Sequence, residues 1–234
     1  MYLGDMTWNE VQHYISHVNN NLVLPVGTCE QHGYHLPLNN DVLLAEYLAK
    51  LLCEHTGALL APTIHYGVNL PCDKFLAGTT SVTKDILQNT IKSLAEWWQF
   101  QGINNILIIT YHGDPFHLEA MQSISSNIIL YDVYEIEYHD ILERQTTIRH
   151  ACEAETSVAL YLYPEKVRFD QIQEHDIPYE QFKEYLFHEK VNKPEGYVGC
   201  LGYPSAATAE KGKIIVDRMV NRMLKECTDI LKAL

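Results

Sequence analysis

Short apolar runs alternate with longer amphipathic stretches along this 234-residue chain, and this alternation restricts the fold more than any other feature. The runs are too short for typical helices and rich in Leu, Ile and Val, which favours buried strands. They cover residues 20–27, 59–64, 103–110 and 127–134. The amphipathic stretches predict helices over residues 41–56, 83–100, 116–126, 153–162 and 208–234. Strands and helices that alternate at this spacing predict an α/β fold, in which a mostly parallel sheet carries helices on both faces.

No internal repeat and no low-complexity linker interrupts this pattern, and the length suits one domain over residues 1–234, or at most two small ones. Residues 169–194 are different in kind, because they are charged and aromatic with weak periodicity. We expect this segment to be a surface excursion or an oligomer contact.

The composition excludes several classes of function. There are 30 Asp and Glu against 17 Lys and Arg, which gives a formal net charge of −13 and disfavours non-specific nucleic-acid binding. No apolar run approaches the length of a membrane-spanning helix. The six cysteines form no CxxC pair, which favours free thiols in a reducing compartment. We therefore expect a soluble, cytoplasmic protein that binds neither nucleic acid nor membranes.

Polar clusters lie where loops follow the predicted strands, or shortly beyond. They are Glu30 and His32 with His35 and Asp41 further on, His112 with Asp114, and His150 with Glu153 and Glu155. In open α/β sheets, ligands bind beyond the carboxyl ends of the strands, where such loops converge. Imidazoles combined with carboxylates suit Zn, Mn or Fe better than Ca or Mg. A single site would use three or four of these groups, so their number suggests two metal ions with a bridging carboxylate and a shared water.

The sequence LPVGTCEQHGYHLPLNND at residues 24–41 resembles the signature of the creatininase family. Further segments agree with that family in order and spacing, so the resemblance covers nearly the whole chain. They are FLAGT at 75–79, YHGD at 111–114, HACEAETS at 150–157 and GYPSAATAEKG at 202–212.

The resemblance implies a metal-dependent amidohydrolase that cleaves C–N bonds, in a three-layer α/β/α sandwich that often assembles as a hexamer. It implies two divalent metal ions per chain, Zn, Mn or Fe. Glu30 and His112 correspond to ligands of one metal, His32 and Asp114 to ligands of the other, and Asp41 to the bridge. Asp114 stands where the family has Glu or Gly, so a shorter carboxylate is retained there.

Two further residues correspond to the groups that carry a proton from the attacking water to the leaving nitrogen, namely His150 and Glu155. An amine leaving group needs such a general acid within hydrogen-bond reach. Three residues are candidates for the substrate side of the site. His35 either orders its loop or faces substrate, Tyr111 either binds a substrate oxygen or fills space, and Glu153 is either a ligand or a supporting group.

Creatininase closes its site with tryptophans shortly before the segment that corresponds to residues 150–157. Here residues 131–149 contain no tryptophan, and Trp8, Trp97 and Trp98 lie elsewhere, where we expect them to pack. We therefore expect the substrate to be a small cyclic amide, amide or formamide other than creatinine. Two alternatives are a non-catalytic scaffold or binding protein with this fold, and a two-metal lyase or phosphoesterase.

Overall fold

The computed structural model describes residues 1–133, 137–175 and 177–233, and a four-stranded parallel sheet lies at its centre. The strands, in the spatial order β2-β1-β3-β4, are β1 (Asn21–Val26), β2 (Leu59–Leu60), β3 (Asn105–Thr110) and β4 (Ile128–Asp132). β1 pairs with β3 along its whole length, from Asn21 opposite Asn105 to Val26 opposite Thr110. The predicted parallel α/β sheet is confirmed.

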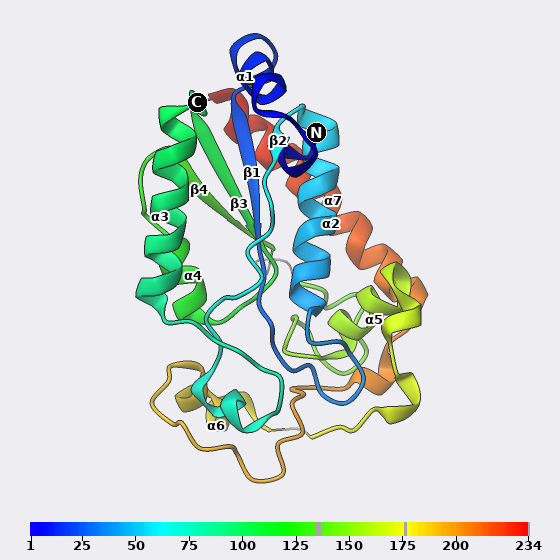
Figure 1. Cartoon of the computed structure of the whole chain (residues 1–234). Helices are drawn as coiled ribbons and strands as arrows, with labels where there is room; N and C mark the ends of the chain where they lie inside the picture. Colours follow the sequence, from blue (N-terminus) through cyan, green and yellow to red (C-terminus); the bar gives the residue numbers. More distant parts are fainter. Residues whose placement is uncertain (134–136, 176, 234) are drawn as a thin grey trace.

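Helices cover both faces of the sheet, which makes three layers (Figure 1). They are α1 (Trp8–His17), α2 (Asn40–Thr56), α3 (Lys84–Phe100), α4 (Pro115–Met121), α5 (Glu153–Leu162), α6 (Tyr179–Leu186) and α7 (Ala209–Ala233). Successive β3 side chains point to opposite faces. Ile106 and Ile108 pack in the core under α3 and α4, whereas Leu107 and Ile109 pack in the core shared with α2, α5 and α7.

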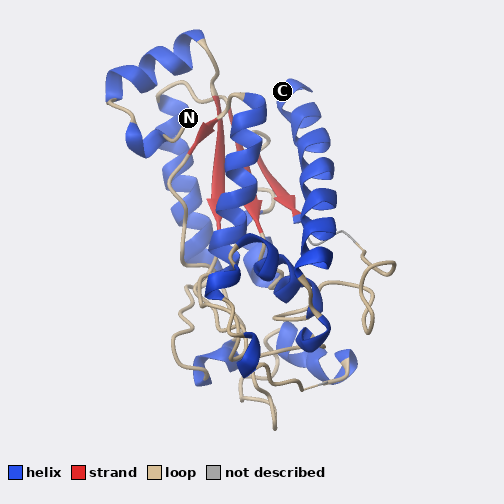
Figure 2. Cartoon of the chain, turned by 90° about the vertical axis from the view of Figure 1, so that its right-hand side faces the viewer, coloured by secondary structure: helices blue, strands red, loops and turns tan. Residues whose placement is uncertain are grey.

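All strands run toward the end of the molecule that is rich in loops, opposite α1 (Figure 2). α2 begins at that end, close to the loop that follows β1. Gly27 permits this approach, because a Cβ atom there would lie only 2.7 Å from the backbone of Val42. The contact sets Asp41, in the first turn of α2, beside the loop that carries Glu30 and His32.

Several elements differ from the sequence prediction. β2 is only two residues long, and α4 ends at Met121 rather than at residue 126. α1 was not predicted, although Thr7 and Glu10 form a capping box at its start. Residue 134, in the last predicted strand, lies outside the described residues. The prediction that the tryptophans pack is wrong for two of them, because Trp8 and Trp97 are largely exposed.

The segment at 169–194 contains α6, a helix of eight residues that the sequence did not predict. It lies beyond the carboxyl ends of the strands (Figure 1). No helix in the described part of the chain is both long and apolar enough to cross a membrane. All six cysteines are free thiols.

Candidate metal centre

A buried cluster of carboxylates and imidazoles lies at the carboxyl edge of the sheet, in the described part of the chain. Its members are Glu30, His32, Asp41, His112, His150 and Glu155. Loops that follow β1 and β3 supply three of them, and the remainder come from the start of α2 and from the start of α5 and the loop before it. These side chains are far apart in sequence, and the parallel sheet brings them together because the ends of its strands meet at one edge.

Asp41 lies at the centre of this cluster and contacts two imidazoles through different oxygens. Its Oδ1 is 3.0 Å from Nε2 of His32, and its Oδ2 is 3.3 Å from Nδ1 of His112. Glu155 completes one group of potential ligand atoms with His32 and Asp41, and Glu30 completes the other with Asp41 and His112. Asp41 therefore belongs to both groups, with one oxygen directed to each.

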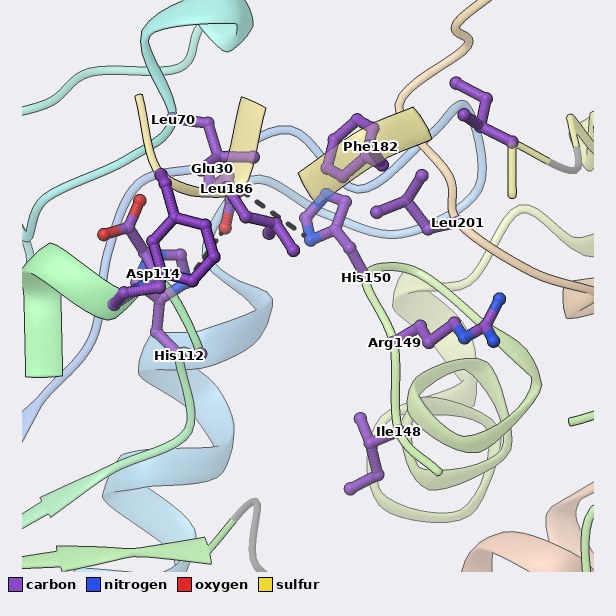
Figure 3. Close-up of a pocket in the computed structure, with 14 residues that line it drawn as sticks. Glu30, Leu70, His112, Asp114, Ile148, Arg149, His150, Phe182, Leu186 and Leu201 are labelled. Atoms are coloured by element: carbon purple, nitrogen blue, oxygen red, sulfur yellow. Dashed lines mark ion pairs between the residues drawn. The ribbon is translucent and has the colours of Figure 1, made fainter. Parts of the chain in front are cut away.

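Glu30 also uses its two oxygens separately. Oε2 lies 3.1 Å from Nδ1 of His112, and Oε1 lies 3.7 Å from Nδ1 of His150. His150 is the most exposed member of the cluster, with 16% of its side chain accessible, and it forms a third ligand group with Glu30 and His32. Figure 3 shows Glu30 between the rings of His112 and His150.

Backbone carbonyls orient the three imidazoles. The distant ring nitrogen of His112, Nε2, lies 2.8 Å from the carbonyl oxygen of Val68. In the same way, Nδ1 of His32 lies 3.1 Å from the carbonyl of Glu30, and Nε2 of His150 lies 2.7 Å from that of Gln31. A nitrogen that donates to a carbonyl leaves the opposite nitrogen as a lone-pair ligand. Each ring therefore presents a metal-binding nitrogen to the carboxylates.

The surrounding charges favour a cation in this cluster. Burial is the largest single effect and would lower the pKa of His32, but the carboxylates of Asp41, Glu155 and Glu30 together outweigh it and raise this pKa to about 10. Burial also opposes charge on His112, yet Glu30 and Asp41 raise its pKa well above the usual value. By contrast, burial lowers the pKa of His150 to about 4, so this imidazole is neutral near pH 7.

The donor set fits divalent metal ions. Oε2 of Glu30 and both oxygens of Asp41 are buried, and none of them accepts a hydrogen bond of good geometry. They face imidazole nitrogens instead, at 3.0 to 3.3 Å. Buried carboxylate oxygens and imidazole nitrogens at these distances need a cation between them, either a proton on the ring or a metal ion. Carboxylate oxygens and imidazole nitrogens are ligands that Zn, Mn and Fe accept alike.

Asp114 follows β3 as predicted, but the structure does not bring its carboxylate into the cluster. Its Oδ1 accepts hydrogen bonds from the backbone N–H groups of Phe116 and His117, at 2.7 and 3.0 Å, and so caps α4. Its Oδ2 lies 2.9 Å from Nε2 of His188. Both oxygens are engaged, and the place expected for Asp114 beside His32 is taken by Glu155.

Glu153 also lies apart from the cluster, although it is fully buried at the start of α5. Its Oε1 is 2.7 Å from Nζ of Lys211 in α7, and both oxygens are 3.1 Å from the backbone nitrogen of Glu143. The same Lys211 ammonium lies 2.5 Å from a carboxylate oxygen of Glu143. These contacts tie α5 to α7. Of the two roles considered for Glu153, metal ligand or supporting group, they correspond to the supporting group.

Neither of the other two residues considered for the substrate side lines the cavity described below. His35 is fully buried, and its Nε2 lies 2.9 Å from the hydroxyl of Thr156 in α5. Tyr111 is almost fully buried in the core that α2, α5 and α7 share. His35 thus lies against α5, where it orders its loop, and Tyr111 lies within the core rather than in the cavity lining.

The sequence drew attention to Gln31 only as a neighbour of the ligands, yet its side chain links several parts of the site. Its Oε1 accepts a hydrogen bond from the backbone of Gly33. Its amide nitrogen contacts Nε2 of His150 at 2.9 Å without a hydrogen bond, because that ring nitrogen donates to the Gln31 carbonyl. The same amide nitrogen lies 3.2 Å from Oδ1 of Asp73 and from the hydroxyl of Tyr197. The only sequence signal for a role of Gln31 in the site was its position between Glu30 and His32.

A cavity of about 300 Å³ opens onto the cluster. Glu30, His112 and His150 lie on its polar side, with Asp114 nearby (Figure 3). The remaining wall is mainly apolar and comes in large part from α6 and its neighbours. A concave, mostly apolar pocket with a few convergent polar groups is the usual form of a small-molecule site.

A parallel α/β sheet that holds a carboxylate and imidazole cluster at the floor of such a cavity is an arrangement that metal-dependent hydrolases use. Residues 4–227 match the creatininase family, described as creatinine amidohydrolase. The chain therefore belongs to the creatininase family, and it is a metal-dependent amidohydrolase.

Individual relatives agree with this assignment. Creatinine amidohydrolase of Pseudomonas putida is 27% identical over 93% of this chain and 92% of its own length. A mycofactocin precursor peptide peptidase of Mycolicibacterium smegmatis is 28% identical, over 90% of this chain and 84% of its own. A solved manganese creatininase has a TM-score of 0.81 at 24% identity, covering 98% of both chains. A mutant creatininase of the Zn-Zn type has a TM-score of 0.79 at 23% identity and the same coverage.

Proposed function

We propose that this protein hydrolyses the C–N bond of a small amide, cyclic amide or formamide other than creatinine, with two divalent metal ions at the cluster. The observation that carries the proposal is the position of Asp41, whose two oxygens face two different imidazoles. A carboxylate in this position can bridge two metals, and the groups on either side of it supply one acid and one imidazole each.

One metal would be held by Glu30, Asp41 and His112, and the other by His32, Asp41 and Glu155. Zn, Mn and Fe all suit these ligands. Metal ions bound there would polarise the amide carbonyl and lower the pKa of the attacking water toward neutrality. We leave Asp114 out of this set, because its two oxygens are engaged with α4 and His188.

His150 is the residue best placed to move a proton. It borders the cavity, its ring is neutral near pH 7, and its Nε2 is oriented by the carbonyl of Gln31. Its Nδ1 faces Glu30 at the polar end of the cavity. A neutral imidazole there can accept a proton from the attacking water and return it to the leaving nitrogen, which otherwise departs as an unstable anion.

Glu155 has two possible parts in this chemistry, as a metal ligand or as a carrier of the same proton. Its Oε2 lies 3.9 Å from Nε2 of His32 and accepts a 2.5 Å hydrogen bond from the backbone nitrogen of Ala151. This hydrogen bond fixes the carboxylate beside His32 and Asp41 and favours a ligand role. We therefore assign Glu155 to the second metal.

The proposal also includes the domain organisation, the cellular location and the oligomeric state expected from the sequence. Residues 1–234 form one domain, the protein works in the cytoplasm, and it assembles as a hexamer. The free thiols support a reducing compartment. Several large apolar side chains on the surface, including Trp97 and Phe100 of α3, support a contact between subunits.

The test is the metal content of the protein, measured by elemental analysis, together with the formation of new amino groups or ammonia from a panel of small amides, lactams and formamides. We expect close to two transition-metal ions per chain, and an activity that a chelator abolishes and added metal restores. A protein that holds no metal after incubation with Zn, Mn and Fe would overturn the proposal and favour a non-catalytic scaffold. Metal-dependent turnover of a phosphoester without amine release would favour a phosphoesterase.

A further inference from the structure

The wall of the cavity that faces away from the metal cluster is almost entirely apolar. Its side chains come from three separate parts of the chain, which meet over the cluster (Figure 3). They are Leu70, Ile177, Phe182, Leu186, Phe187 and Leu201. An apolar surface of this kind contributes favourably to the free energy of binding only when an apolar group displaces water from it.

Charge on the wall is nearly absent. Arg149 is the one Lys or Arg among the described residues that line the cavity, and its guanidinium points away from Glu30 and His112 (Figure 3). At the polar end, the lining carries the Glu30 and Asp114 carboxylates and the His112 imidazole, whose pKa, despite burial, Glu30 and Asp41 raise, so the charges lie there and not on the wall. An anionic substituent such as a phosphate therefore finds no cationic partner on the apolar wall.

We infer that this cavity is a subsite for an uncharged apolar substituent of the substrate, an alkyl or aryl group attached near the scissile amide. This inference rests on the proposed function, which places the amide carbonyl at the polar end, beside Glu30 and His112. A substituent that extends from that carbonyl along the cavity meets the apolar wall. The substrate class is thereby narrowed to amides with one apolar arm, and phosphorylated or polyhydroxylated amides are disfavoured.

The wall is built into the fold. α6 packs through Phe182 and Tyr185 into a small core, where the partners include Leu70, Cys72 and Tyr197. These contacts join α6 to the loop that follows β2 and to the chain after residue 194. A wall buried in this way holds its shape before substrate arrives, which reduces the ordering cost of binding.

A second contact fixes the position of the wall relative to the metal cluster. His188, two residues beyond α6, lies 2.9 Å from Asp114 and packs against the ring of Phe116, with ring centres 4.1 Å apart. Asp114 is itself two residues beyond the ligand His112. Asp114, which the sequence suggested as a metal ligand, thus joins the apolar wall to the loop that follows β3 and carries His112.

Acetohydroxamate and hexanohydroxamate provide the test, because both chelate metals through the same group and differ only in the alkyl chain. Binding to the metal-loaded protein is measured by calorimetry. We expect the longer compound to bind more tightly, by up to about fourfold for each methylene that is buried. Acetamide and hexanamide are compared by ligand-observed NMR on the protein as purified, with the same expectation, since neither needs a metal to enter the cavity.

Variants at Leu186 test whether the dependence of binding on chain length arises at the apolar wall. Leu186→Ser removes apolar surface and Leu186→Trp fills space, so both should reduce the advantage of the six-carbon over the two-carbon compounds by about tenfold. Val191→Ser is the matched control, because Val191 is an exposed residue of the same segment outside the cavity lining. It should bind all four compounds as the wild type does.

The outcomes separate this inference from the proposed function. If acetohydroxamate binds but chain length has no effect in either assay, the subsite is refuted and the metal proposal stands. If neither hydroxamate binds but hexanamide does, in a way that depends on Leu186, the subsite is supported and the metal proposal fails. A chain-length effect that persists in both Leu186 variants would also overturn the inference.

Discussion

Removal of the Lys211 ammonium should destabilise the fold without touching the metal cluster. Lys211 is 14% exposed, and its partner Glu153 is fully buried. In Lys211→Met the side chain keeps its apolar stem and loses only the charge. Glu153 then retains one backbone donor, from Glu143, and otherwise faces α7 as an unpaired buried carboxylate.

The magnitude follows from this environment. Loss of one partner of a buried ion pair costs about 3–5 kcal/mol, and the remaining backbone donor puts the expected loss at the lower end, about 3 kcal/mol. In a protein of this size a loss of about 3 kcal/mol corresponds to about 6–12 °C in Tm. Glu153→Gln combined with Lys211→Met removes both charges and should recover part of this loss.

The assay is urea unfolding followed by circular dichroism, with every variant at the same metal loading because bound metal adds to apparent stability. Lys213→Met is the matched control, since Lys213 pairs with Asp217 on the exposed surface of the same helix. It should change the free energy of unfolding by less than about 0.5 kcal/mol. A loss below about 1 kcal/mol in Lys211→Met would refute the argument, as would full stability of Glu153→Ala.

Other predictions concern the metal centre and the assembly. Asp41→Ala should lose both metal ions, since this carboxylate belongs to both ligand groups, and full metal content by elemental analysis would contradict the bridge. Glu155→Gln should hold about one ion instead of two; two ions with turnover lowered by about 10²-fold would make Glu155 a proton carrier instead. Asp114→Asn should keep both ions. Light scattering should give the mass of six 26.9-kDa chains, and a monomer would contradict the hexamer.

The central strands and most helices could be predicted because their signals are local. The four inner residues of β3, 106–109, are apolar on both faces, as expected for a strand covered on both sides, so a short run of sequence was enough. β2 is shorter than predicted because the continuous ladder with β1 covers only Leu59 and Leu60, and pairing resumes at a single isolated bridge between Ile64 and Val26. α1 lacks buried residues, and its capping box at Thr7 was its only clear signal.

The candidate ligands could be placed at one edge of the sheet because a parallel topology brings strand ends together. Which carboxylates join the cluster was not predictable in the same way. Asp114 is engaged by His188, which lies 74 residues away, in a segment of weak periodicity. Glu153 is engaged by Lys211, 58 residues away in α7. Such pairs depend on tertiary packing, for which the local sequence carries no pattern.

The apolar wall of the cavity was unpredictable for a related reason. α6 is only eight residues long, so its periodicity is weak, and its buried residues Phe182 and Tyr185 meet partners from remote loops. The sequence indicated that residues 169–194 differ from the rest of the chain. It could not indicate that this segment covers the metal cluster.

The imidazoles of the cluster are oriented by peptide carbonyls, at Val68, Glu30 and Gln31, and this has a consequence for how the protein can change over generations. A side chain that orients a ligand can be lost through one substitution, whereas every amino acid supplies the same carbonyl. Point mutations at the wall of the cavity can therefore accumulate and alter the accepted substrate while the orientation of the imidazoles is inherited unchanged. The accepted substrate can therefore change without loss of the orientation that the metal-binding imidazoles need.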